Sequence, residues 1–320
     1  MSPSAGAERY ATRTRQSGFS MIELMASVVV LLIVSGAVMA GMVQMIRTQG
    51  TVANRTELHS SVRSATELLQ QEVGQAGRVS LPGAVTLTSP VLLPGTQIVG
   101  VSSASGMFNG ERLVVGTGAN QETVTLSGVS PSTNLITASF LLTHAAGEPV
   151  AVLGGFATGV VPTNVANGST GSVLKLYGDI NSDGNMVYIE YTCDTNARNL
   201  YRNVMPMAAA IKPALGSAQL LLTNVLPNPD NTPCFTYQQK TVTGTTFVLN
   251  VAITLTVQTQ YKDPQTNRFQ TETKALLNVA PRNVFEAWQL AGIGANSRLQ
   301  PMPPSVMNLL RSVVTQVVTQ

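Results

Sequence analysis

The sequence is poor in charged residues, and this shortage excludes several classes of protein. Only 11% of its 320 residues are Asp, Glu, Lys or Arg, against roughly 25% in ordinary soluble domains. A charge-rich disordered chain and a coiled-coil rod are therefore excluded. The net charge of +3 gives little attraction to phosphates, so no nucleic-acid partner is expected. Apolar residues reach a normal 44%, and a chain of this length can bury a substantial core.

Residues that perform catalysis are also scarce. The chain has two histidines, His59 and His144, far apart in the sequence, and it has no Gly-x-Ser-x-Gly motif. Nucleophilic catalysis needs an activated nucleophile beside a base, and a metal hydrolase needs a cluster of His and carboxylate ligands. We therefore expect that the protein is not an enzyme.

There are only two cysteines, Cys193 and Cys234, and they are widely separated. Metal sites usually use closely spaced pairs, so this spacing does not suggest a metal. In an exported domain an even number of cysteines favours a disulfide, which would here close a long loop. The alternative is two buried free thiols.

What the sequence does contain is one long apolar run. No charged residue occurs between Leu24 and Ile46, and about 20 such residues span a bilayer as a helix. Arg9, Arg13 and Arg15 precede the run, which predicts a cytoplasmic N-terminus and a remainder outside the cytoplasm. The run is longer than the 7–15 apolar residues of a secretory signal peptide. We expect a single membrane-spanning segment over 24–46.

The helical pattern continues beyond this run. Apolar residues recur at spacings of three and four, which is typical of one face of a helix; they are Leu58, Val62, Ala65, Leu69, Val73 and Ala76. Gly77 and Pro82 then stop the pattern. The sequence predicts one helix over about 19–78, with a lipid-compatible first half and an amphipathic second half.

Glu23 interrupts this pattern at the start of the apolar run. A carboxylate at that place either reaches the headgroups or pairs with a cation in an assembled state. It belongs to the segment QSGFSMIEL, residues 16–24. This segment, with the arginines before it and the uncharged run after it, resembles the processing motif of type IV prepilins.

The resemblance implies a specific maturation. In that family, prepilin peptidase cuts after the glycine on the cytoplasmic side, so residues 1–18 would be the leader and Gly18 its last residue. Phe19 would become the N-methylated first residue, and Glu23 would pair with the N-terminal amine of a neighbouring subunit. Implied partners are the peptidase and other major and minor pilins. The implied location is the bacterial inner membrane, with the head in the periplasm, and later the pilus at the cell surface.

The exported part is predicted to be mostly β-structure. Short Val/Thr/Leu-rich runs alternate with Gly, Pro, Asn and Ser after residue 80, as in strands and turns. We expect a small β module over 79–155 and a pilin-like sheet region over 156–284. The end of that region resembles large minor pilins of the PilW type. The tail, 285–320, is either a loose arm or a packing helix. The expected fold class is α+β: a long N-terminal helix followed by a mostly antiparallel, pilin-like β head.

One motif in the head suggests a cofactor. Residues 179–190 match the twelve-position calcium loop D-x-[DN]-x-[DN]-G-x5-E, whose oxygens converge on the cation. The predicted ligands are Asp179, Asn181, Asp183, Asn185 and Glu190. However, both flanks have the pattern of strands, so Glu190 could be carried away from the turn. The alternative is a hairpin with an Asp-Gly turn and no metal.

The function expected from these features is that of a minor pilin-like structural subunit in type IV pilus assembly or priming. One alternative is a type II secretion pseudopilin of the J kind, which would have the same N-terminus. A second alternative is a pilus-tip adhesin or DNA-uptake receptor, in which residues 96–155 bind a ligand. A membrane-anchored periplasmic enzyme would instead function without cleavage at Gly18.

Overall fold

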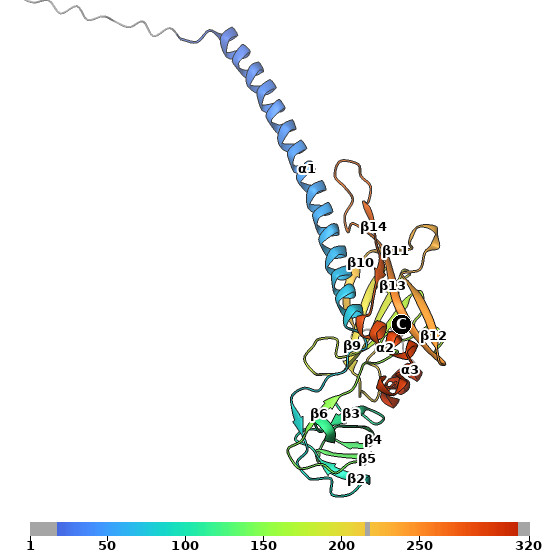
Figure 1. The fold of residues 1–320 in the computed structure, drawn as a ribbon. Helices are drawn as coiled ribbons and strands as arrows, with labels where there is room; N and C mark the ends of the chain where they lie inside the picture. Colours follow the sequence, from blue (N-terminus) through green and yellow to red (C-terminus); the bar gives the residue numbers. More distant parts are fainter. Residues whose placement is uncertain (1–17, 215–217, 313–320) are drawn as a thin grey trace, which may run out of the picture.

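The computed structural model describes residues 18–214 and 218–312, and its dominant element is one long helix. Helix α1 runs without interruption over Met21–Gln75, about 80 Å at 1.5 Å per residue. It projects far out of the head (Figure 1). It ends where Gly77 takes a φ of +83°, a conformation that favours glycine. A long apolar helix followed by antiparallel sheets confirms the predicted α+β fold.

The chain next forms a β module at the end of the molecule farthest from the start of α1 (Figure 1). Its antiparallel strands lie in the order β1-β6-β3-β4-β5-β2. They are β1 (Val85–Thr86), β2 (Gly95–Gly100), β3 (Arg112–Val115), β4 (Glu122–Ser130), β5 (Leu135–Phe140) and β6 (Pro149–Val152), with the 3-10 turn η1 (Gly118–Asn120) before β4. The module has its own core, which includes Leu113, Leu126 and Phe140.

Two further antiparallel sheets complete the head. The first has the order β10-β9-β8-β7 and consists of β7 (Val173–Gly178), β8 (Val187–Asp194), β9 (Asn199–Pro206) and β10 (Gln219–Thr223). In the second, the long strand β13 pairs with each of the other three strands. These strands are β11 (Val225–Leu226), β12 (Phe235–Val242), β13 (Thr245–Gln258) and β14 (Thr271–Val279), with the 3-10 turn η3 (Pro229–Asn231) before β12.

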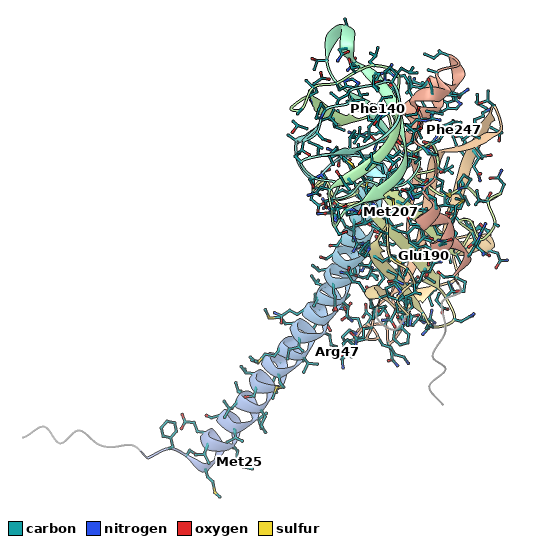
Figure 2. All side chains as sticks on the ribbon, turned by 90° about the horizontal axis from the view of Figure 1, so that it is seen from below. Met25, Arg47, Phe140, Glu190, Met207 and Phe247 are labelled. Carbon is teal, nitrogen blue, oxygen red and sulfur yellow. A yellow bond between two sulfur atoms is a disulfide. The ribbon has the colours of Figure 1, made fainter. Side chains whose placement is uncertain are left out.

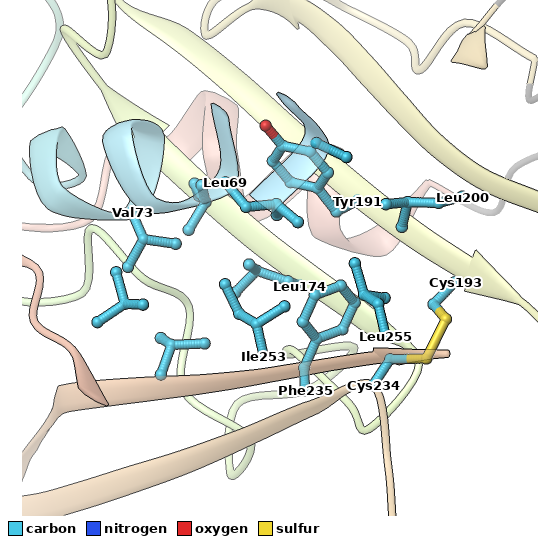
Figure 3. Packing of buried hydrophobic residues seen from close by; sticks show 14 of the residues in the cluster. Leu69, Val73, Leu174, Tyr191, Cys193, Leu200, Cys234, Phe235, Ile253 and Leu255 are labelled. Carbon is cyan, nitrogen blue, oxygen red and sulfur yellow. A yellow bond between two sulfur atoms is a disulfide. The ribbon is translucent and has the colours of Figure 1, made fainter. Parts of the chain in front are cut away.

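The second half of α1 packs into the core that these two sheets share. All six residues of the predicted apolar stripe are buried: Leu58, Val62, Ala65, Leu69, Val73 and Ala76. Figure 3 shows Leu69 and Val73 facing Leu174 of β7 and Ile253 of β13. The helix is therefore bound to the head by ordinary hydrophobic burial, at about 25 cal/mol per Å² of apolar surface.

The C-terminal part packs on the head, as in the packing-helix alternative for the tail. Helices α2 (Arg282–Gly292) and α3 (Pro304–Arg311), with the 3-10 turn η4 (Asn296–Arg298) between them, follow β14. Val306, Leu309 and Leu310 of α3 are buried. The Gln300 side chain exchanges hydrogen bonds with the backbone N–H and C=O of Arg112. The described part of the tail therefore links the β module to the rest of the head.

Candidate functional site at the start of the first helix

The residues around the predicted cleavage point lie outside the helix and are open to solvent. Ser20 is extended, with φ −72° and ψ 142°, and precedes the first turn of α1. Phe19 has 80% of its surface exposed, and no heavy atom lies within 4 Å of where a Cβ on Gly18 would stand. The bond between Gly18 and Phe19 is therefore accessible to a peptidase.

Glu23 lies in the first turn of α1, where a negative charge interacts favourably with the partial positive charge of the helix N-terminus. It is exposed, and within the described part of the chain its carboxylate has no hydrogen-bond or ion-pair partner. Among the described residues, the carboxylate is therefore open to a cation from another molecule.

In the described part of the chain, nothing from the head covers residues 21–46 of α1. Every residue over 21–46 is exposed, and Figure 2 shows the segment between Met25 and Arg47 projecting away from the head. Among the described helices, α1 is the one that is long and apolar enough to cross a membrane. An apolar surface on all sides of a helix requires lipid or other helices around it.

Comparison with known proteins supports this interpretation of the N-terminus. Residues 13–39 match the family model of the prokaryotic N-terminal methylation motif. No curated protein and no solved structure matches the chain. The motif indicates a type IV pilin-like or pseudopilin-like protein that prepilin peptidase processes and that a membrane anchors through its apolar helix. The match ends within α1, so it does not identify the head.

Asp179, Asp183 and Asn185, three of the predicted calcium ligands, lie in one turn, whereas Glu190 lies outside it. Asp179 is buried, and its Oδ1 accepts hydrogen bonds from the backbone N–H groups of Asp183 and Gly184. Gly184 has a φ of +81°, and a Cβ there would lie 2.3 Å from the Cα of Pro82. These are the features of the alternative Asp-Gly turn, in which an aspartate caps backbone amides and a glycine provides the positive φ.

Glu190 lies away from this turn because strand β8 carries it to a different place. It is paired in register with Lys175 of β7, and its Oε1 lies 2.7 Å from Lys212 Nζ and 2.6 Å from the Tyr188 hydroxyl. Burial opposes its ionisation, but these partners outweigh burial and lower the pKa of the Glu190 carboxyl. Among the described residues, no three His, Cys, Asp or Glu side chains form a group that could hold a metal ion.

The two cysteines form a disulfide. Cys193 at the end of β8 is bonded to Cys234, which immediately precedes β12, with a Cα–Cα distance of 6.5 Å. Figure 3 shows the bond at the edge of the core, where it joins the two sheets. This pairing supports the disulfide rather than the alternative of two free thiols.

The structure also contains a buried ion pair that the sequence did not predict. Glu72 of α1 is 3% exposed, and both of its oxygens lie 3.1 Å from Arg202 Nε on β9. The Tyr191 hydroxyl of β8 donates to the same carboxylate, and burial raises the pKa of Tyr191, so its proton is retained. Glu72 lies three residues after Leu69 and therefore on the same, buried face of the helix. This spacing is the feature of the sequence that indicates the burial of Glu72.

Each of the two histidines lies beside at least one carboxylate. His59 is exposed on α1, and its Nδ1 lies 2.6 Å from Glu272 Oε2 of β14. His144 is buried, with Nε2 at 2.8 Å from Glu122 and Nδ1 at 2.6 Å from Glu148. Burial opposes protonation, but the two carboxylates outweigh it and raise the pKa of the imidazole. Because a carboxylate lies at each ring nitrogen, the imidazole fixes the loop that follows β5.

Proposed function

We propose that this chain is a minor pilin-like subunit that joins a type IV pilus or the complex that primes its assembly. The observation that carries the proposal is the exposed apolar half of α1, with Glu23 and the accessible Gly18–Phe19 bond at its start. The role is structural, and no catalytic step is assigned to the chain. Before assembly the subunit would lie in the inner membrane, with a cytoplasmic N-terminus and a periplasmic head.

The proposed mechanism follows from where the unpaired charges would lie. Cleavage after Gly18 frees the amine of Phe19, four positions before Glu23. When the helices of several subunits pack together, this amine on one subunit would neutralise Glu23 on the next. An unpaired carboxylate in an apolar bundle is costly, so the pairing would set the axial register of the subunits.

The shape of the head favours a minor subunit over a major one. The β module extends beyond the two sheets that pack on α1 (Figure 1). A head of this size is difficult to repeat along a thin filament, whereas one copy at the tip meets no such restriction.

Mass spectrometry of the mature N-terminus tests the proposal directly. We expect the wild-type chain from cells to begin at N-methylated Phe19, and Gly18→Ala to block the cut. Glu23→Gln should be cut normally but should be absent from sheared filaments, with Ser20→Ala as a matched control that is both cut and incorporated. A chain that still begins at Met1, or Glu23→Gln incorporated as wild type, would contradict the proposal.

A pseudopilin of the J kind would have the same processing and the same helix. Deletion of the gene separates the two machines, because loss of surface pili with normal protein secretion supports the pilus. Loss of secretion with normal pili supports the type II system instead.

A second candidate function, recognition at the pilus tip, has support from the β module. The segments 92–94 and 141–143 lie opposite each other, between the Gly95–Phe140 pair and the Val91–His144 bridge. They expose Leu92, Leu93 and Leu141 by 73%, 68% and 78%. Contiguous exposed apolar side chains are typical of interaction sites. Replacing all three leucines with serine should abolish surface attachment while filaments still form, and unchanged attachment would refute this candidate.

A further inference from the structure

The hairpin between β13 and β14 lies against α1 immediately beyond its apolar run. Figure 1 shows that its connection, residues 259–270, is the part of the head that reaches farthest along α1 toward the N-terminus. Gln265 Nε2 donates to Thr48 Oγ1 at 3.0 Å, and Thr51 Oγ1 donates to Asp263 Oδ1 at 3.1 Å. A Cβ on Gly50 would lie only 2.9 Å from Pro264 Cγ. These contacts fix the height of the hairpin on the helix.

That height corresponds to the headgroup layer of a membrane. The uncharged run ends at Ile46, so Thr48 and Thr51 lie roughly 3 and 8 Å further along the axis at 1.5 Å per residue. The headgroup region on one side of a bilayer is about 5–8 Å thick. If residues 24–46 fill the hydrocarbon core, the hairpin tip lies among the lipid headgroups.

The tip, residues 261–269, exposes the side chains that this layer favours. Tyr261 and Phe269 are 63% and 44% exposed, and Lys262 Nζ lies 5.8 Å above the Phe269 ring. Arg268 is exposed as well. Aromatic rings are enriched at membrane interfaces, and Lys and Arg near the surface are attracted to anionic lipids.

The only acidic residue of the tip does not offset this positive charge at the surface. Asp263 is 3% exposed, and its Oδ1 accepts the backbone N–H groups of Gln265 and Thr266. Its own N–H donates to the carbonyl of Arg268 at 2.8 Å. The carboxylate thus holds the tip in shape, while the charges that reach solvent from the tip are cationic.

We propose that the tip 261–269 binds the phosphates of anionic phospholipids on the outer surface of the membrane that α1 crosses. The contact orients the head against the bilayer before the subunit enters a filament. This inference rests on the membrane-spanning role of residues 24–46. It goes beyond the proposed function, because assembly by helix packing does not require the head to touch lipid.

The test uses the full chain in vesicles and a fluorescent label at the tip. The Cys193–Cys234 disulfide makes an introduced cysteine the only free thiol. Thr266→Cys places a bimane label on the tip, and Ser132→Cys places the same label on an exposed turn of the distant β module. With nitroxide on the headgroups of phosphatidylglycerol vesicles, we expect strong quenching at 266 and none at 132. Equal quenching at both positions, or none at 266, would overturn the inference.

Charge variants then identify the contact. In the Thr266→Cys background, Lys262→Gln with Arg268→Gln should reduce quenching to the lower level found in phosphatidylcholine vesicles. Lys240→Gln, an exposed lysine on β12, is the matched control and should change nothing. Quenching that the double variant leaves unaltered would refute binding to anionic lipid.

Resistance to carbonate extraction tests the anchor separately. A chain that is extracted from the vesicles contradicts the membrane span, and with it the proposed function. A chain that stays inserted but has an unquenched tip refutes only the lipid contact, and leaves a neighbouring protein subunit as the partner of the tip.

Discussion

Thr51 and Asp263 are joined by a 3.1 Å hydrogen bond although they lie 212 positions apart. The bond connects the end of the apolar run to the β13–β14 hairpin. The same carboxylate oxygen accepts the backbone N–H groups of Gln265 and Thr266. One side chain therefore both shapes the hairpin tip and attaches it to α1.

The first prediction concerns this carboxylate. Asp263→Ala removes the acceptor of the two backbone N–H groups and of the Gln270 side-chain amide. It also leaves the Thr51 hydroxyl with the carbonyl of Arg47 in its own helix instead of a partner on the hairpin, so the tip should open more often. We expect amide hydrogen exchange over 261–270 to accelerate roughly tenfold, with the rest of the head unchanged. Asp263→Asn, which keeps an acceptor oxygen, should show a smaller effect. Exchange as slow as in the wild type would mean that the tip is held by other contacts.

The second prediction concerns the buried pair of Glu72 and Arg202. Arg202→Met leaves a buried carboxylate without its cation, which should destabilise the fold by about 3–5 kcal/mol. Glu72→Met combined with Arg202→Met should recover most of this loss, because the charge is then removed together with its partner. Urea unfolding of the detergent-solubilised chain measures both. If the double variant is as unstable as the single one, the pair acts through packing rather than charge.

The third prediction concerns the disulfide between Cys193 and Cys234. It closes a loop with a sequence separation of 41, and the chain-entropy relation gives such a crosslink roughly 4 kcal/mol. Cys193→Ala with Cys234→Ala should lower the unfolding midpoint accordingly. The wild type under reducing conditions should show the same shift, while the double variant should not respond to reductant. A reductant-sensitive double variant would show that the effect is not due to this bond.

The fourth prediction concerns Glu111 in the β module. The residue is fully buried; its Oε2 accepts the Phe108 N–H at 3.2 Å, and within the described residues its Oε1 has no partner. Burial raises the pKa of the Glu111 carboxyl to about 8. The folded state keeps this proton, whereas the unfolded chain releases it near pH 4.3. The contribution of the protonated Glu111 carboxyl to the free energy of unfolding is therefore complete below about pH 4.3, and it is lost as the pH rises through 8.

Denaturant unfolding at pH 5 and pH 8 checks this dependence. The wild-type module should lose stability on the order of a few kcal/mol between the two values. In Glu111→Gln the decrease in the free energy of unfolding between pH 5 and pH 8 should be smaller, so its slope against pH should flatten. Because the pKa of His144 is also raised, a smaller decrease with rising pH should remain, and His144→Gln should remove it. A slope that is equally steep in Glu111→Gln would show that Glu111 is ionised in the folded protein.

Much of the α1 segment could be predicted from the sequence because its signals are local. The apolar run, the offsets of Gly18, Phe19 and Glu23, and the stripe that ends at Ala76 all depend on spacing along one helix. The short strands after residue 80 were predicted for the same reason. The helix needs no distant segment to form its hydrogen bonds, so its pattern appears intact in the sequence.

The position of Glu190 in the fold depended on the tertiary structure. Glu190 is the twelfth position of the calcium motif that begins at Asp179, but the pairing of β7 with β8 sets it beside Lys175. A change of register by one residue would turn it to the opposite face of the sheet, and local composition does not specify that register.

The sequence by itself thus determined the anchor, its processing motif and the class of the head. Only the tertiary structure decided which buried charges meet, where Gln300 binds the β module and how high the hairpin tip lies on α1. The physical reason is that helix and strand periodicity follow from local backbone geometry. Ion pairs and hairpin positions instead depend on contacts between distant segments, which form only when the whole core is packed.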